Sequence, residues 1–405
     1  MFDIKEIKVQ LREFFVRQVQ TDSPGERISR ISGLMKTACG DLERWKQILG
    51  EVSARWPGRK PSLLVAGIVD NPYDCRSIPE FNDQYTCLAS DGSQILPSRH
   101  EMPELSLIHT GEIRVSYRTG TPPILRSKVK LLTPDHLAQS APDPGERPTF
   151  EQFVLDERSV GEFEGLATLA AQSPIDSPAL ALQDGSLIFW NLEDRPAQWR
   201  SHQLERLKAA FSSLHEKKTP VVGYISRPGS RDLVNALAIM EYFLKNGYIP
   251  DKPAEVLSFV PPGEETPVFS GLTDRHIYQQ ILGPGQRSPW LASSSHILED
   301  YSPDHRIFFC YLRVWDEIAR LEVPHWACED ADFIHGAILD QCRKGKGYPI
   351  TLSEAHEKAV VRGPDRELFY RLAAEEWRKA NQSIGIKTPL STRSAKQRSK
   401  ARPVF

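Results

Sequence analysis

The chain has 405 residues, of which 40% are hydrophobic and 26% charged, and its formal net charge is −2. By length it could hold two or three domains, its composition is that of a globular protein, and its charge excludes a generally basic protein that coats DNA. It contains no apolar run long enough to span a membrane and no signal-peptide pattern, so we expect a cytoplasmic protein without membrane contact. The six cysteines form no C-x-x-C pair, which predicts free thiols.

Amphipathic patterns predict helices up to about residue 60, and we expect residues 1–80 to form a helical N-terminal region. A short strand is predicted within SLLVAGIVDNPYD (62–74). A second strand is predicted within YTCLASDGSQILP (85–97), with Asp91 at its end.

A β-hairpin is predicted over residues 111–132, GEIRVSYRTGTPPILRSKVKLL, with its turn at 119–123. Side chains alternate between the two faces of a strand, so its basic residues gather on strand faces. On the first strand, Arg114 and Arg118 share one face. On the second strand, one face carries Arg126, Lys128 and Lys130. We call these five residues the basic ribbon. It is either a solvated sheet face or a surface that follows DNA phosphates.

Helix and strand patterns alternate after a Pro-rich loop at 138–149. A helix is expected over 150–172, a buried strand over ALALQDGSLIFW (179–190), a helix from about 202, and a strand followed by a helix over 220–247. Residues 258–300 are loop-rich, strand-like residues surround 308–314, and helices follow from 347. We expect residues 81–380 to form the main α/β domain and residues 381–405 to be a basic disordered tail.

The tripeptide Asp-Gly-Ser occurs twice, at Asp91 and at Asp184, each time after strand-like residues. Carboxylates at strand ends of an open α/β sheet can share divalent cations, which offset their mutual repulsion and promote phosphodiester hydrolysis. Glycine after each aspartate permits a close approach of the backbone, and serine can hydrogen-bond the turn. One copy alone would more often be a simple turn.

The order of five motifs resembles the NurA family of DNA-repair nucleases, over about residues 85–372. The motifs are LASDGSQILPSRHE, DERSVGEFEGLATLA, ALQDGSLIFW, VVGYISRPGSRDLVNAL and GYPITLSEAHEKAVV. The resemblance implies a ribonuclease H-like mixed sheet flanked by helices, here with a helical N-terminal extension and a β-hairpin insertion. It also implies a manganese-dependent 5′-to-3′ DNA nuclease that is a homodimer and works with the hexameric HerA helicase in DNA end resection and double-strand break repair.

The resemblance assigns Asp91 and Asp184 as ligands of Mn²⁺ or Mg²⁺, with two ions expected, and His356 as a further ligand. The family glutamate follows an arginine by four residues, which fits Arg158 and Glu162. Glu164 is the rival position, and a surface ion pair between Arg158 and Glu162 is the non-catalytic alternative.

Other residues near these motifs bear on the same site. Thr351 and Glu354 have capping-box spacing, which places His356 early in a helix, and Tyr348 is a candidate lining residue. Where the family often has a lysine, this chain has Ser226 and Arg227, so Arg227 and Arg231 are candidate phosphate ligands. No P-loop is present to suggest an intrinsic ATP motor.

Two other interpretations stay open. A catalytically silent member would bind DNA or a helicase as an adaptor, although it would be expected to lack metal ligands such as Asp91, Asp184 and His356. Another metal-dependent phosphodiesterase on the same fold could act on RNA.

Overall fold

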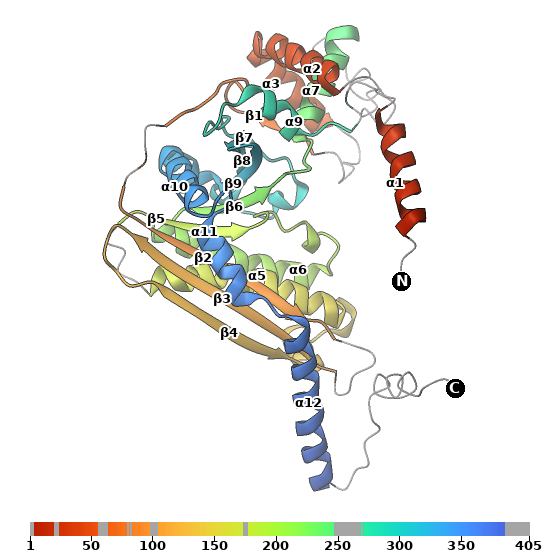
Figure 1. The fold of residues 1–405 in the computed structure, drawn as a ribbon, viewed down its shortest axis with the longest axis vertical. Coiled ribbons are helices and arrows are strands. Elements are labelled where there is room, and N and C mark those ends of the chain that lie inside the picture. The colour runs from red at the N-terminus through yellow and green to blue at the C-terminus, as the bar shows by residue number, and fades with distance from the viewer. Residues whose placement is uncertain are drawn as a thin grey trace. The chain divides into compact units, whose positions relative to one another are not determined.

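Helices begin the chain and strands alternate with helices beyond residue 64 in the computed structural model (Figure 1). It describes residues 4–19, 24–55, 64–78, 81, 83–97, 104–172, 177–246, 269 and 271–384. The chain divides into two units. The first comprises Met1–Ser77, Ser226–His296 and Phe308–Leu321, and the second comprises Ile78–Ile225, Ile297–Ile307 and Glu322–Phe405.

The first unit combines N-terminal helices with segments from the middle of the chain. Its helices are α1 (Ile4–Val19), α2 (Pro24–Cys39), α3 (Leu42–Arg55), α7 (Asp232–Asn246) and α9 (Asp274–Ile281). Its strands follow the order β1 (Gly67–Ile68), β7 (Leu291–Ala292), β8 (Ile307–Val314) and β9 (Glu317–Pro324), with the last two extending slightly past its limits. Large side chains such as Trp45, Phe243 and Tyr278 fill its core. The predicted N-terminal helices are therefore present.

The second unit contains a mixed five-stranded arrangement. In spatial order its strands are β6 (Val221–Ser226), β5 (Ala179–Asp184), β2 (Tyr85–Ile95), β3 (Ser106–Tyr117) and β4 (Ile124–Leu132). β2, β3 and β4 pair antiparallel, whereas β5 pairs parallel with β2 and β6. Its helices are α4 (Pro134–Ser140), α5 (Phe150–Ala171), α6 (Ala197–Glu216), α10 (Ala331–Lys344), α11 (Ile350–Ala359) and α12 (Gly363–Ile384).

Helices cover both faces of the second unit's strands. A side chain at Gly111 of β3 would collide with the main chain of Ala355 in α11. The next residue, Glu112, lies on the opposite face, where it approaches Gly165 of α5. α11 therefore packs on one face and α5 on the other (Figure 1). This arrangement confirms the predicted α/β class with a mixed sheet flanked by helices.

Several predicted boundaries differ from the structure. β2 continues to Ile95, so Asp91 lies inside this strand and not at its end, because β3 pairs with it past this point. β5 ends at Asp184, so only the first half of 179–190 is a strand. The hairpin turn is confirmed between Tyr117 and Ile124, but Arg118 lies beyond β3 with a positive φ and does not share a strand face with Arg114.

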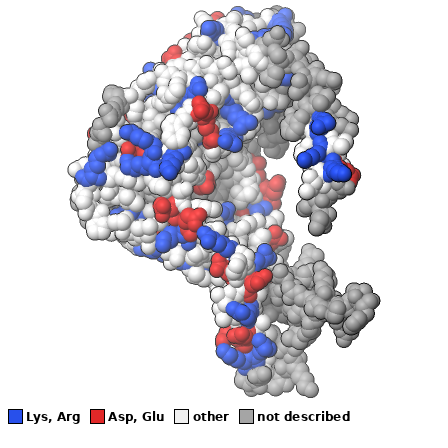
Figure 2. All heavy atoms as spheres, viewed as in Figure 1, with Lys and Arg blue, Asp and Glu red and all other residues white. Residues whose placement is uncertain are grey.

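The predicted domain limits at residues 80 and 380 do not follow the two units, because residues 226–296 and 308–321 group with the N-terminal residues. α12 extends to Ile384, and the predicted tail from residue 385 lies outside the described residues. The six cysteines form no disulfide with one another. None of the described helices combines the length and apolar character that crossing a membrane requires. Figure 2 shows acidic and basic side chains interspersed on the face it presents.

Candidate active site

Asp91 and His356 meet at the junction of β2 and α11. The Nδ1 atom of His356 lies 2.9 Å from Oδ2 of Asp91, while Oδ1 of Asp91 accepts the main-chain N–H of Gly92 at 2.8 Å. The Asp91 side chain is 14% exposed and that of His356 is 59% exposed. The pair therefore joins a largely buried carboxylate to an imidazole that solvent and a substrate can reach.

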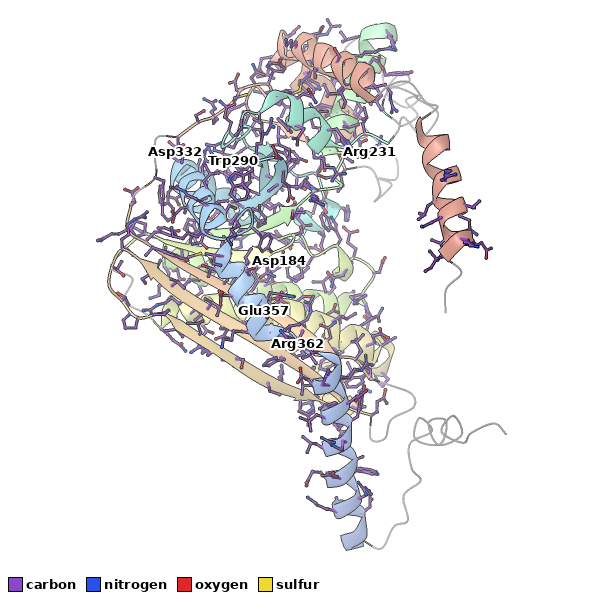
Figure 3. All side chains as sticks on the ribbon, viewed as in Figure 1. Asp184, Arg231, Trp290, Asp332, Glu357 and Arg362 are labelled. Atoms are coloured by element: carbon purple, nitrogen blue, oxygen red, sulfur yellow. The ribbon has the colours of Figure 1, made fainter. Side chains whose placement is uncertain are left out.

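Asp184 lies beside Asp91 because of strand register. β2 and β5 are parallel, and Ser90 pairs with Gln183, so the next residue on each strand is an aspartate. Asp184 ends β5 and its carboxylate is hydrogen-bonded to Tyr348 (Figure 3 labels Asp184). The two Asp-Gly-Ser copies thus bring their carboxylates to adjacent strands.

The Asp184 carboxyl group titrates above its ordinary range. Partial desolvation is the main cause of its raised pKa, and the hydrogen bond from Tyr348 opposes it. The negative charge of Asp91 raises this pKa further, whereas His356 lowers it. The aspartates therefore repel each other in the absence of a cation, which is the electrostatic situation that a divalent cation relieves.

Glu162 reaches the same site from α5. This helix begins after Thr149, whose hydroxyl accepts the N–H of Gln152 while Gln152 Oε1 accepts the N–H of Thr149. Glu162 is 3% exposed, accepts a 2.7 Å hydrogen bond from Gln183, and lies 3.0 Å from Arg158. Its pairing with Arg158 is thus buried, unlike the surface pair of the alternative interpretation.

Burial raises the pKa of Glu162 to about 8, although the positive charge of Arg158 opposes this effect. The charges of Asp91 and Asp184 raise it further, so all three carboxylates affect one another electrostatically. Glu164 points elsewhere. It is 44% exposed and forms a two-pronged ion pair with Arg206 at 2.8 and 2.9 Å. The structure therefore brings Glu162, and not Glu164, to the aspartates.

The side chains of Asp91, Glu162, Asp184 and His356 suit a hard divalent cation. They offer carboxylate oxygens and one imidazole, which are ligands that Mg²⁺ and Mn²⁺ bind. Oε1 of Glu162 is buried without a well-formed hydrogen bond despite its proximity to Arg158, and Oε1 of Gln183 also has no hydrogen-bond partner. However, no three His, Cys, Asp or Glu side chains within the described ranges already converge as a metal cluster. Small side-chain movements would be needed to hold an ion.

The glycine and serine of each Asp-Gly-Ser copy have different roles. A Cβ at Gly92 would lie 2.8 Å from Oε1 of Glu162, so glycine allows α5 to approach β2. Gly185 has a φ of +109°, which a residue with a side chain rarely adopts. Ser93 donates to the carbonyl oxygen of Ala359, and Ser186 donates to Glu322 at 2.6 Å. Each serine therefore anchors a distant segment.

α11 is attached to the rest of the unit at both ends. Gln341 of α10 accepts hydrogen bonds from the N–H and the hydroxyl of Thr351 at 3.1 and 2.8 Å. At the other end, Ser93 and Nδ1 of His109 bind the carbonyl oxygen of Ala359. The predicted capping box at Thr351 is wrong, because the helix begins at Ile350 and Thr351 bonds to Gln341, and His356 lies in the last turn of the helix and not in its first. These anchors fix the helix that carries His356.

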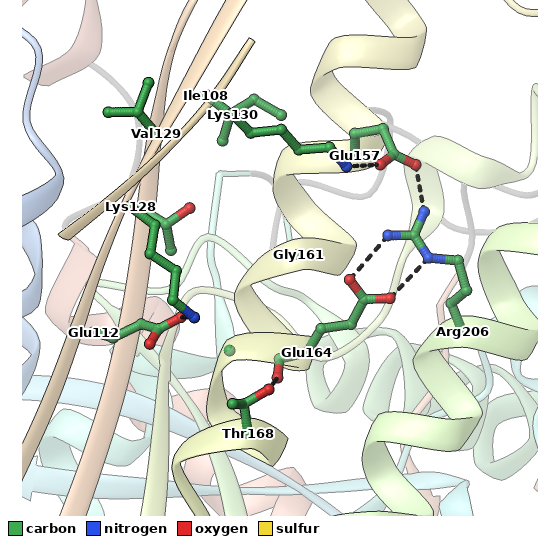
Figure 4. Close-up of a pocket in the computed structure, with 12 residues that line it drawn as sticks. Ile108, Glu112, Lys128, Val129, Lys130, Glu157, Gly161, Glu164, Thr168 and Arg206 are labelled. Carbon is green, nitrogen blue, oxygen red and sulfur yellow. Dashed lines mark hydrogen bonds and ion pairs between the residues drawn. The ribbon is translucent and has the colours of Figure 1, made fainter. Parts of the chain in front are cut away.

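Three members of the basic ribbon are engaged by acidic side chains on the α5 face, and Figure 4 shows two of them, Lys128 and Lys130. Glu112, which is buried, pairs with Arg126 at 2.5 Å and with Lys128 at 2.6 Å. Lys130 pairs with the buried Glu157 at 2.8 Å, and Glu157 also binds Arg206. Apart from Arg126, these residues and Glu164 line a pocket between β3, β4 and the helices α5 and α6. Contact of this ribbon with DNA stays a prediction.

The remaining cations of the sequence prediction divide between the two units. Arg114 is half-buried on β3, and Arg118 donates to the carbonyl oxygen of Asp83 at 2.9 Å. Arg227 and Arg231 belong to the first unit, where Arg227 pairs with Glu317 at 3.0 Å and Arg231 donates to the carbonyl oxygen of Phe269 at 3.1 Å. Ser226 also donates to Glu317. Phosphate binding by Arg227 and Arg231 stays a prediction.

Sequence reasoning missed one buried contact of the site. Gln183 holds Glu162, and the only sequence signal for it was its position immediately before Asp184 in a strand. The hydrogen bond between Tyr348 and Asp184 places this tyrosine at the site, as its position before His356 had indicated. The site thus consists of carboxylates carried by two strands and a helix of an α/β unit. Residues from α10 and α11 and from the turn between them complete it.

Comparison with known proteins shows which family the chain belongs to. The NurA domain family matches residues 85–361, a span that contains Asp91, Glu162, Asp184 and His356. The crystal structure of the NurA nuclease from Sulfolobus solfataricus is similar at a TM-score of 0.45 and 11% identity, over 91% of this chain and 98% of that one. No curated protein matches the chain. The chain belongs to the NurA family, and this membership supports a nuclease function.

Proposed function

We propose that the chain is a metal-dependent DNA nuclease whose catalytic residues are Asp91, Glu162, Asp184 and His356. The observation that carries this proposal is the meeting of Asp91, from β2, with Asp184, at the end of β5, and with His356 of α11. Glu162 is electrostatically linked to both aspartates. Side chains from distant parts of the chain thus form one acidic site inside the span that the NurA family matches.

In this proposal the three carboxylates and His356 hold Mn²⁺ or Mg²⁺, with two ions expected. A divalent cation at such a site supplies Lewis acidity toward a phosphodiester and lowers the pKa of water. Asp91 orients the imidazole of His356 through Nδ1, which directs Nε2 away from Asp91. Tyr348 orients the carboxylate of Asp184, and Gln183 orients that of Glu162.

We further propose the finer activity that the family resemblance implies. This is 5′-to-3′ exonuclease action, possible endonuclease action on single strands, and a cytoplasmic role in DNA end resection with a HerA-type hexameric helicase. A homodimer is also proposed. Three side chains on the outermost strand β4 support self-association, because they are apolar and exposed: Leu125 (43%), Val129 (65%) and Leu131 (48%).

The deciding experiment uses purified protein with 5′- and 3′-end-labelled DNA and matched RNA, in Mn²⁺, Mg²⁺ or EDTA. We expect DNA cleavage with Mn²⁺ or Mg²⁺, none in EDTA, and product ladders that reveal polarity. DNA binding without cleavage under every metal condition would instead identify a silent adaptor. Preferential cleavage of RNA would identify another phosphodiesterase on this fold.

A further inference from the structure

A second set of cations lies in the second unit and shares one residue, Arg118, with the basic ribbon. It consists of Arg118 after β3, Arg343 and Lys344 in the last turn of α10, and Lys346 in the turn before α11. We call these four residues the basic cluster. Figure 2 shows Lys and Arg side chains gathered on the face where α10 meets the ends of β2 and β3.

One buried acid, Asp340, contacts members of this cluster. The Asp340 side chain is 2% exposed and accepts a 2.6 Å hydrogen bond from the hydroxyl of Tyr85. It forms an ion pair with Lys344 and lies 3.8 Å from Arg118 and 3.9 Å from Arg343. Three positive charges thus share one buried negative charge, and Lys346 in the following turn adds a fourth, so the cluster keeps a positive excess. In the basic ribbon, by contrast, Glu112 and Glu157 are matched by Arg126, Lys128 and Lys130.

The cations of the cluster remain accessible despite this anchor. The exposed fraction of the side chain is 56% for Arg343, 38% for Arg118 and 34% for Lys344. Lys346 is also exposed. Attraction to the carboxyl end of α10 would account for Arg343 and Lys344 alone. It does not account for Arg118 and Lys346, which lie outside that helix.

Arg118 and Lys346 share an uncommon backbone conformation. Their φ angles are +61° and +56°, in the left-handed region that residues with a side chain seldom adopt. Such outliers persist where the surrounding structure enforces them, and they concentrate at functional sites. Two separate turns therefore hold a cation in a strained position, Arg118 beside Asp340 and Lys346 two residues after Lys344.

The turn that carries Lys346 is rigid and leads directly to the catalytic site. Gly345 must be glycine, because a side chain there would collide with the carbonyl oxygen of Tyr348. Gly347 has a φ of +112°, and its N–H donates to the carbonyl oxygen of Cys342 at 2.8 Å. Tyr348, two residues beyond Lys346, is hydrogen-bonded to Asp184.

The geometry points to the basic cluster as a surface, in the same unit as the catalytic carboxylates, that holds the sugar–phosphate backbone of the substrate strand. This inference rests on the proposed nuclease function. Lys and Arg that contact phosphates bind without regard to sequence, and each contact releases a counterion. Lys344 also stacks over the ring of Tyr117 at 4.8 Å, which limits the freedom of its ammonium group.

The test removes the two charges that least support the fold. The double variant Arg343→Gln/Lys346→Gln leaves Arg118 and Lys344 to pair with Asp340. Its matched control, Arg378→Gln/Lys379→Gln, removes two exposed charges from α12. Binding of end-labelled single-stranded and duplex DNA is measured in EDTA across a range of NaCl concentrations, with cleavage by the wild type in Mn²⁺ assayed in parallel. Melting temperatures check that both variants fold.

We expect the cluster variant to bind DNA more weakly and to lose about 1.4–1.8 from the magnitude of the slope of log K against log salt, at 0.7–0.9 per contact. The control should match the wild type, and Arg343→Lys/Lys346→Arg should restore binding. An equal loss with RNA would support recognition of the phosphodiester backbone itself. If the double variant is unstable, Lys346→Gln alone, at the tip of the turn, should lower the slope by about 0.7–0.9.

Two outcomes would overturn the inference while the proposed function stands. The cluster variant could bind DNA as the wild type does while the wild type cleaves DNA, or the control could weaken binding equally. If the wild type neither binds nor cleaves DNA, the proposed function itself fails.

Discussion

The carboxylate of Asp91 lies 2.9 Å from Nδ1 of His356, although 265 positions separate the two residues. Asp91 lies within β2, and α11 brings His356 to it because both ends of this helix are hydrogen-bonded to other elements. The pair therefore depends on long-range contacts, and changes far from either residue should affect it.

Asp184→Asn should reduce cleavage by at least about 100-fold, since loss of a residue that merely orients a metal ligand already costs 10–100-fold. In EDTA the variant should be at least as stable as the wild type, because it removes a carboxylate that Asp91 repels. Mn²⁺ should raise the melting temperature of the wild type more than that of the variant. Thermal denaturation with and without Mn²⁺ measures this, and equal Mn²⁺ shifts would contradict the assignment.

Glu162→Gln should impair cleavage far more than Glu164→Gln. Glu164 is half-exposed and pairs with Arg206, so its loss should cost at most about 1 kcal/mol of stability. Initial cleavage rates of both variants at one Mn²⁺ concentration give the comparison. The opposite ranking would show that the wrong face of α5 had been assigned to the site.

The Glu162→Gln variant also tests the raised pKa of Glu162. Its folded pKa of about 8 exceeds its ordinary value of 4.5, so the folded protein holds this proton over the interval between them. Stability linked to this group is fully present below about pH 4.5 and is lost as the pH rises toward 8. In EDTA, the free energy of unfolding should fall more steeply over this range for the wild type than for Glu162→Gln. Chemical denaturation gives the free energy of unfolding of both proteins at each pH. If the two profiles are parallel, the raised pKa of Glu162 is refuted.

Gly111→Ala should weaken cleavage through α11. Its new methyl group would collide with the main chain of Ala355 and push the helix that carries His356 away from Asp91, at a cost of about 1–3 kcal/mol. The control is Gly161→Ala in α5, where no atom lies within 4 Å of the added carbon. That change should stabilise the protein by about 0.5–1 kcal/mol and preserve activity. Urea denaturation and cleavage rates measure both effects.

Neutralising the basic ribbon should destabilise the fold before it reports on DNA. Arg126→Ser/Lys128→Ser would leave Glu112 buried without its ion pairs, at a cost of about 3–5 kcal/mol. Lys130→Ser should cost less, because Glu157 keeps Arg206. Adding Glu112→Gln should recover part of the lost stability, and DNA binding by this compensated variant then tests the ribbon. Weakened binding at restored stability would support its contact with phosphates.

The sequence was sufficient to predict the strands that carry the two aspartates, whereas it left Glu164 as a rival to Glu162. The repeated Asp-Gly-Ser follows two strand patterns, and parallel strands place equivalent positions side by side. Only the resemblance to the family motif, in which a glutamate follows an arginine by four residues, favoured Glu162. These features depend on local patterns and on one family of motifs.

Long-range pairing was not predictable in the same way. Nothing local to Lys128 or Lys130 shows that Glu112 and Glu157 neutralise them, because this depends on how β3, β4 and α5 pack. Asp91 was placed at a strand end because its glycine resembles a turn, yet pairing with β3 extends the strand. Asp340, the acid that contacts both Arg118 and Lys344, lies on α10, far from Arg118 in the chain.

The attachment of α11 has a consequence for synthesis of the protein. Asp91, Glu162 and Asp184 leave the ribosome well before residues 350–359, which carry His356 and the carbonyl oxygen that binds Ser93 and His109. A nascent chain therefore displays its acidic strands while it still lacks the histidine and the helix that covers them. Hydrolytic capability would be acquired late in translation, after the strands of the second unit have already been made.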